Sequence, residues 1–189
     1  MQRLVICCAW LLALSPAPAL AAPEEKENLY EIEVLVFENR LPQYLGDELL
    51  AGEDGNLTSA ALDKALAVGA PSAGQSKLSG MAAALERDPH YRVLAHHRWL
   101  QAAEPKAAAK ARRIQANAGA RPGELDGTIR FYSSRFLHLD ANLVFRQDGR
   151  NYRLNELRRM RIQDVHYFDH PRLSMLARVA PLDKEKPAR

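Results

Sequence analysis

Apolar and polar residues alternate over the last third of the chain, and the clearest run is FLHLDANLVF at residues 136–145. Alternation with a period of two is typical of a strand that buries one face. The pair Asp148-Gly149 follows, and this dipeptide favours the two-residue type I′ turn of a β-hairpin. The pattern therefore predicts a long antiparallel hairpin and, after a turn at 169–172, one more strand. The predicted strands cover residues 127–146, 151–167 and 173–179.

The turn also predicts the register of this hairpin. With Asp148 and Gly149 at the tip, Gln147 pairs with Arg150, and each step away from the turn pairs the next two residues. One face of the first strand then carries side chains toward the core: Leu137, Leu139, Ala141, Leu143 and Phe145. The other face is polar, with His138 opposite Arg159, Asp140 opposite Leu157, Asn142 opposite Asn155 and Phe136 opposite Arg161. Tyr167 and Asp169 lie an even number of residues after Arg159 on the same predicted strand and its turn, so we expect their side chains further along the same polar face.

The rest of the chain predicts fewer regular elements. YEIEVLVF at 30–37 predicts a strand, and 90–100 predicts a second one. Residues 77–87 predict a helix, because Leu78, Met81, Ala82 and Leu85 recur at helical spacing. A short helix is expected over 58–68, within a Gly- and Pro-containing loop from 39 to 76. For 102–123, which is rich in alanine and charge, a solvated helix and a lack of regular structure both stay open.

These elements predict the α+β class: a mainly antiparallel sheet with one or two helices on one face and a long C-terminal hairpin. The length of 189 residues is typical of one domain. We expect that domain over 22–181, with 40–77 and 102–123 as loop segments and 182–189 as a charged tail.

The first 21 residues have the pattern of a secretory signal peptide. A positive start precedes the apolar run Leu4 to Leu14, and the small residues of Ala19-Leu20-Ala21 follow a Pro-containing break. The run is too short for a good membrane span, so we predict cleavage after Ala21 and an exported mature chain without one. Both cysteines, Cys7 and Cys8, leave with this segment, which excludes disulfides and a thiol nucleophile in the mature chain.

Charge is distributed unevenly along the chain. Residues 127–180 hold ten arginines, five acidic residues and no lysine, a balance of +5. This asymmetry indicates a local surface that faces anions, but it is well short of the balance expected of a nucleic-acid binder. Two interpretations of the polar hairpin face stay open. Its arginines pair with Asp140 across the strands, or their planar forks hold carboxylates or sugar acids.

Signatures of catalysis and of metal binding are weak. The sequence has no nucleophile elbow, no S-x-x-K, no P-loop and no HExxH helix, so we do not predict an enzyme. His138 and Asp140 could meet His166, Asp169 and His170 around zinc. Arg159 and Arg161 lie close to them and repel a divalent cation, so neither a metal nor another cofactor is expected. Trp99 is more often a core aromatic at such a position, with stacking on a sugar as its secondary role.

Four segments carry a family resemblance: YEIEVLVFEN at 30–39, YRVLAHHRWLQ at 91–101, LDGTIRFYSSRFLHLDANLVF at 125–145 and YRLNELRRMRIQDVHYFDHPRLSMLARVAP at 152–181. Together they resemble the CsiV-type peptidoglycan-binding proteins of the Gram-negative periplasm. The resemblance implies a non-enzymatic periplasmic protein that binds the cell wall and supports peptidoglycan synthesis and cell shape. It also implies a place beside a penicillin-binding protein synthase or its activator lipoprotein.

The resemblance and the hairpin register together predict the ligand-binding residues. The family pattern carries over to Arg135, His138, Arg158, Arg159, Arg161, His166, Tyr167, Asp169 and His170. The polar face adds Asp140 to this set. An alternative stays open, in which the chain is a protein-interaction module that engages a peptidoglycan synthase complex without binding glycan.

Overall fold

A computed structural model describes residues 28–40, 59–69, 74–117 and 124–182, and the structural statements below concern these residues. The predicted signal peptide, most of the predicted loop 40–77 and the C-terminal tail from 183 lie outside them.

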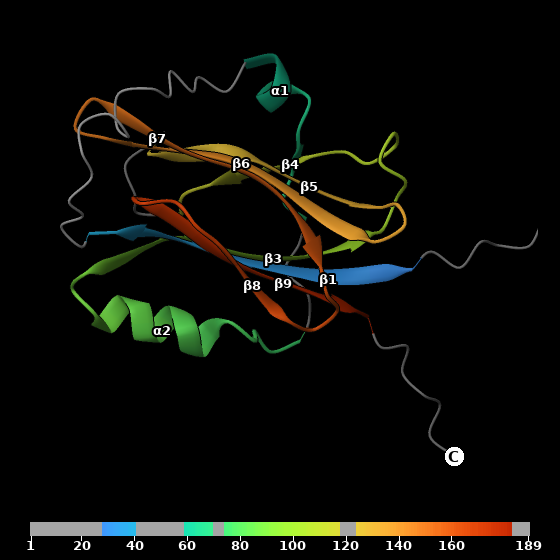
Figure 1. Cartoon of the computed structure of the whole chain (residues 1–189), viewed down its shortest axis with the longest axis horizontal. Helices are drawn as coiled ribbons and strands as arrows, with labels where there is room; N and C mark the ends of the chain where they lie inside the picture. Colours follow the sequence, from blue (N-terminus) through green and yellow to red (C-terminus); the bar gives the residue numbers. More distant parts are fainter. Residues whose placement is uncertain (1–27, 41–58, 70–73, 118–123, 183–189) are drawn as a thin grey trace, which may run out of the picture.

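Two β-sheets pack face to face and form the body of the molecule (Figure 1). The four-stranded sheet has the order β3-β1-β9-β8, and the five-stranded sheet has the order β2-β4-β5-β6-β7. The strands of the first are β3 (Tyr91–Ala102), β1 (Leu29–Asn39), β9 (Leu173–Pro181) and β8 (Val165–Phe168). Those of the second are β2 (Leu66–Ala67), β4 (Arg112–Gln115), β5 (Leu125–Ser133), β6 (Leu137–Gln147) and β7 (Arg150–Met160). All neighbours are antiparallel except β2 and β4.

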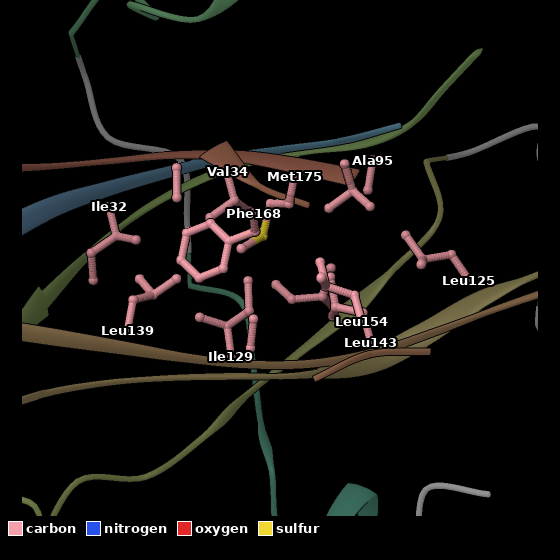
Figure 2. Close-up of a cluster of buried hydrophobic side chains, with 14 of the residues drawn as sticks. Ile32, Val34, Ala95, Leu125, Ile129, Leu139, Leu143, Leu154, Phe168 and Met175 are labelled. Atoms are coloured by element: carbon pink, nitrogen blue, oxygen red, sulfur yellow. The ribbon is translucent and has the colours of Figure 1, made fainter. Parts of the chain in front are cut away.

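The core lies between the two sheets, where apolar side chains from their inner faces interdigitate. Figure 2 shows Ile32, Val34 and Phe168 of one sheet meeting Ile129, Leu139 and Leu154 of the other. The predicted core side of β1 is confirmed, because Ile32, Val34 and Val36 are buried in this cluster and Tyr30 packs against it. Burial of such side chains contributes roughly 1.5–3 kcal/mol each, which makes this interface the main source of stability.

Two short helices complete the described chain. Helix α2 (Ser79–Arg87) covers the outer face of the four-stranded sheet, and α1 (Ser59–Asp63) lies on the opposite side of the molecule (Figure 1). Of the residues predicted to form the apolar stripe, Leu78 and Ala82 pack on Leu35 of β1, whereas Met81 is exposed, so the stripe that contacts the sheet is narrower than expected. The predicted α+β class is confirmed, with two stacked sheets in place of one.

The register predicted for the C-terminal hairpin is confirmed. Strands β6 and β7 pair from Gln147↔Arg150 at the tip to Leu137↔Met160 at the base. Asp148 and Gly149 have φ values of 50° and 74°, as a type I′ turn requires.

Three of the other predicted elements are wrong in detail. The strand predicted over 127–146 is two strands, which reverse at Ser134 to Phe136 without the glycine or proline that usually signals a turn. The strand predicted over 151–167 ends at Met160, because a turn with Gln163 at φ 68° carries the chain into the other sheet as β8. Between 102 and 123, β4 forms where a helix or irregular chain was expected.

Candidate functional site

The outer face of the five-stranded sheet carries a row of functional side chains near the base of the hairpin. Tyr132 of β5 pairs with His138 of β6, and His138 pairs with Arg159 of β7. Side chains directly opposite each other on one face of antiparallel strands lie about 4.5–5.5 Å apart at their Cβ atoms. The apolar partners Phe131, Leu139 and Met160 point into the core, so the alternation of the strands places the row on the outside.

Arg159 is held by an aromatic ring. The centre of its guanidinium group lies 3.3 Å from the ring centroid of Phe136, and that of Arg135 lies 5.5 Å from the same centroid. Phe136 is 36% exposed at the reversal between β5 and β6. Neither arginine forms an ion pair within the described part of the chain.

Tyr132 is the second support of this surface. Its ring stacks on His138 with centroids 5.1 Å apart, and the cations of Lys106 and Arg130 lie 5.6 and 5.5 Å from its centroid. His138 Nδ1 lies 2.9 Å from the carbonyl oxygen of Phe136, and a carbonyl only accepts, so Nδ1 donates. This bond fixes the imidazole and turns Nε2 away from the backbone.

We call this group the outer-face cluster, and it consists of Lys106, Arg130, Tyr132, Arg135, Phe136, His138, Asp140 and Arg159. Asp140 is its acid and accepts a bond of 2.8 Å from Arg130. Four cations against one carboxylate leave the cluster positive. Asp140 thus pairs across the strands with Arg130 of β5 and not with an arginine of the hairpin, as the first interpretation expected. Arg135 and Arg159 lie near the ring of Phe136 and keep their forks free of acids within the described residues.

Two predicted residues lie next to the cluster but contact other groups. Arg158 belongs to the inner face, where it binds Glu156 and covers the ring of Phe168 at 5.1 Å. Arg161 follows the end of β7 and is exposed, and its backbone N–H donates to His166 Nε2 at 2.9 Å. His166 thereby braces the turn between β7 and β8.

The remaining predicted residues do not share this face, contrary to the expectation from parity. Tyr167 lies on the outer face of the four-stranded sheet, where its ring stacks on Phe37 and its hydroxyl bonds Asp169 and Ser174. Burial, with Asp169 beside the hydroxyl, raises the pKa of Tyr167. His170 Nδ1 accepts the N–H groups of Arg172 and Leu173, both at 3.2 Å, and so stabilises the turn before β9. The switch of sheets after Met160 is the physical cause of this separation.

Trp99 cannot act as a stacking surface for sugar in this structure. It is 0% exposed, lies in the core between the sheets, and donates its indole N–H to Gln101 at 3.0 Å. Trp99 is therefore a core residue, as its position in a strand favoured.

The structure also contains a buried acidic site that the sequence did not predict. Glu33 lies on the outer face of β1, but α2 and the residues before it cover this carboxylate, which is fully buried. It accepts hydrogen bonds from Ser76 Oγ, from the N–H of Lys77 at 2.9 Å and of Leu78 at 3.4 Å, and from His96 Nε2 at 2.9 Å. Burial by itself raises the pKa of Glu33, but these bonds outweigh it and hold the pKa at about 2, against an ordinary value of 4.5.

A second buried carboxylate, Glu38, joins the ends of several strands. It bonds Arg92 at 2.9 Å and both Arg40 and Arg172 at 3.2 Å. Arg92 also bonds the buried Glu124 at 2.5 Å. Part of the arginine excess seen in the sequence therefore balances buried acids and is not available to a ligand.

The described residues were also searched for a metal site and for a helix that could cross a membrane. Over the described ranges, no three His, Cys, Asp or Glu side chains are placed so that they could hold a metal ion. Within those same ranges, neither helix has the length and apolar character needed to cross a membrane.

A family model described as "Peptidoglycan-binding protein, CsiV" matches residues 59–182. This range contains every residue of the outer-face cluster. Among curated proteins and among solved structures, none matches the chain.

Proposed function

This chain belongs to the CsiV family of peptidoglycan-binding proteins, and on that premise we propose that it binds the cell wall through the outer-face cluster. The observation that carries the proposal is the pair of exposed guanidinium groups of Arg135 and Arg159. Arg159 lies over the ring of Phe136 at 3.3 Å and Arg135 lies 5.5 Å from the same centroid, and neither forms an ion pair with another described residue. Guanidinium groups recognise carboxylates through parallel N–H bonds, and peptidoglycan stems carry carboxylates.

We further propose that binding is non-catalytic and takes place in the periplasm, after removal of the signal peptide at Ala21. There the protein would support peptidoglycan synthesis and cell shape. A penicillin-binding protein synthase or its activator lipoprotein is the protein partner that we expect beside it.

Sedimentation with purified sacculi tests the proposal. Wild-type protein should pellet with the sacculi, and the double variant Arg135→Ala/Arg159→Ala should stay largely in the supernatant. Both side chains are exposed, and neither is part of the core. The melting temperature should therefore change by no more than a few degrees, since surface substitutions away from such features usually stay within about 0.5 kcal/mol.

The matched control is Arg87→Ala/Arg150→Ala, which removes the same charge from two exposed positions. Arg87 lies in α2 on the opposite side of the molecule, and Arg150 lies at the far end of β7. We expect this variant to pellet like the wild type. Wild-type protein that stays in the supernatant would refute wall binding, and equal losses in both variants would refute the assignment to this face.

A further inference from the structure

We infer that the outer-face cluster recognises the carboxylates of the peptide stems and not the faces of the sugar rings. The inference rests on the proposed wall binding and names the part of the wall that is bound. It follows from the way in which the aromatic rings and the cations are arranged.

A protein that holds sugars by stacking needs an accessible aromatic face, because the C–H groups of a sugar ring pack flat on the π-system. The aromatic faces of the cluster are already occupied. Tyr132 is 3% exposed and is covered by His138, Lys106 and Arg130. Phe136 is more exposed, but Arg159 lies directly over its ring at 3.3 Å.

Three other aromatic side chains of the described residues were candidates for a platform, and none of them provides one at this site. Trp99 is sealed in the core. Tyr152 is covered by Arg172 on the side of the buried acidic network, and Tyr167 lies on the other sheet. The rings near the cluster thus serve as supports for cations.

Stacking leaves a guanidinium group able to bind acids. When the plane of the group lies on a ring, its N–H bonds point outward within that plane and stay free to form a two-pronged bond with a carboxylate. The ring also restricts the long side chain before the ligand arrives, which lowers the entropy cost of binding. Phe136 is therefore a positioning residue, and Arg159 and Arg135 are the groups that would touch the ligand.

The balance of charge favours an acidic ligand as well. Lys106, Arg135 and Arg159 have no ion pair among the described residues, whereas Arg130 is neutralised by Asp140. In intact wall the lactyl carboxyl of the muramyl sugar is consumed in the amide bond to the stem. The free carboxylates of the polymer consequently belong to the stem peptides, while the sugar rings are neutral.

Pelleting on three polymers tests the inference: intact sacculi, sacculi whose carboxylates have been converted to primary amides, and chitin, which offers neutral amino sugars. We expect pelleting with intact sacculi, at least about tenfold weaker binding to amidated sacculi, and none to chitin. Equal binding to amidated and intact sacculi would overturn the inference and leave the proposed function standing. A failure to bind intact sacculi would overturn both.

Soluble competitors identify the source of the carboxylate. Free stem tetrapeptide should displace the protein from sacculi at concentrations at which N-acetylmuramic acid, with its free lactyl carboxylate, does not. Displacement by N-acetylmuramic acid alone would overturn the assignment to the stems.

Three variants examine the geometry. Arg159→Lys keeps the charge but loses the planar fork, so it should bind intact sacculi about threefold more weakly, and Arg159→Ala about tenfold. Phe136→Leu keeps an apolar group but loses the ring, and it should weaken binding while both arginines remain. Arg150→Ala is the control for charge and should bind like the wild type. If Arg159→Lys bound sacculi as strongly as the wild type while Arg159→Ala bound weakly, positive charge alone would explain binding. That result would contradict a role for the planar guanidinium fork of Arg159.

Discussion

Replacement of Glu33 by glutamine removes one charge from a fully buried acidic site and keeps the size of the side chain. In the wild type the carboxylate accepts from Ser76, from His96 and from two backbone N–H groups before α2. A glutamine side chain has one acceptor oxygen, and its NH2 group would face N–H donors. At least one buried donor is then left without a partner, at about 1–3 kcal/mol.

The pKa of Glu33 gives a second measure of the same effect. A shift from 4.5 to about 2 corresponds to about 3 kcal/mol of stability at neutral pH, at 1.36 kcal/mol per unit. Because the folded pKa is lowered, this stability is fully present above the unfolded value of 4.5 and is lost as the pH falls through about 2. We expect Glu33→Gln to lower the free energy of unfolding by about 3 kcal/mol at pH 7. For a domain of this size that is a melting temperature lower by roughly 10 °C.

Urea unfolding measures this effect directly. The sequence has two tryptophans, and a chain that begins at Ala22 keeps Trp99 alone, whose fluorescence reports on the core. The difference between wild type and variant should shrink by about 2 kcal/mol from pH 7 to pH 3. Over that range the carboxylate of the unfolded chain, with a pKa of 4.5, becomes protonated, while that of the folded protein stays mostly ionised.

Glu31→Gln is the matched control, since Glu31 lies on the same outer face of β1 and approaches Arg98 at 4.0 Å. It should change stability clearly less than Glu33→Gln, because the contact of 4.0 Å is long for an ion pair and the Glu31 side chain is not fully buried. Equal unfolding midpoints for wild type and Glu33→Gln at pH 7, or a difference that does not vary with pH, would refute the reasoning.

Three further predictions concern the two sheets. Gly127→Ala should lose about 3 kcal/mol or fail to fold, because its Cβ would lie 2.3 Å from the backbone oxygen of Asn142; a thermal melt near that of the wild type would contradict this. Asp140→Asn should strengthen pelleting on sacculi about two- to threefold, since it frees Arg130 and removes the acid of the cluster; weaker pelleting would make Asp140 a ligand contact. Tyr167→Phe should cost about 1 kcal/mol in urea unfolding through the lost bonds to Asp169 and Ser174, and should leave pelleting unchanged; reduced pelleting at unchanged stability would assign Tyr167 to the binding face.

Features specified by neighbouring residues could be predicted from the sequence. The Asp148-Gly149 pair has the backbone preference of a type I′ turn, and the alternation of the flanking residues allows one register that buries Leu139 and Leu154 together. The placement of His138 and Arg159 opposite each other on the outer face follows from these two signals. The helix at 79–87 was likewise predicted from the helical spacing of the apolar residues in this segment.

The tertiary structure decided what depends on contacts between distant segments. The turn at Gln163 carries the chain from the five-stranded into the four-stranded sheet, and this separates Tyr167 from Arg159. Lys106 joins Tyr132 because the backbone near Pro105 bridges to Ser133. Such contacts form only when the two sheets and their connections pack together.

Sequence by itself thus determined strands β1, β3 and β9, the hairpin register and the membership of a peptidoglycan-binding family, because turn propensity and alternation act between near neighbours. Only the folded chain decided which charged side chains remain available to bind a ligand. Glu33 and Glu38 are buried among donors from segments far apart in the sequence, while Arg159 finds a ring and no acid within the described residues. Burial and pairing are properties of packing in three dimensions, and a one-dimensional pattern of charges does not contain them.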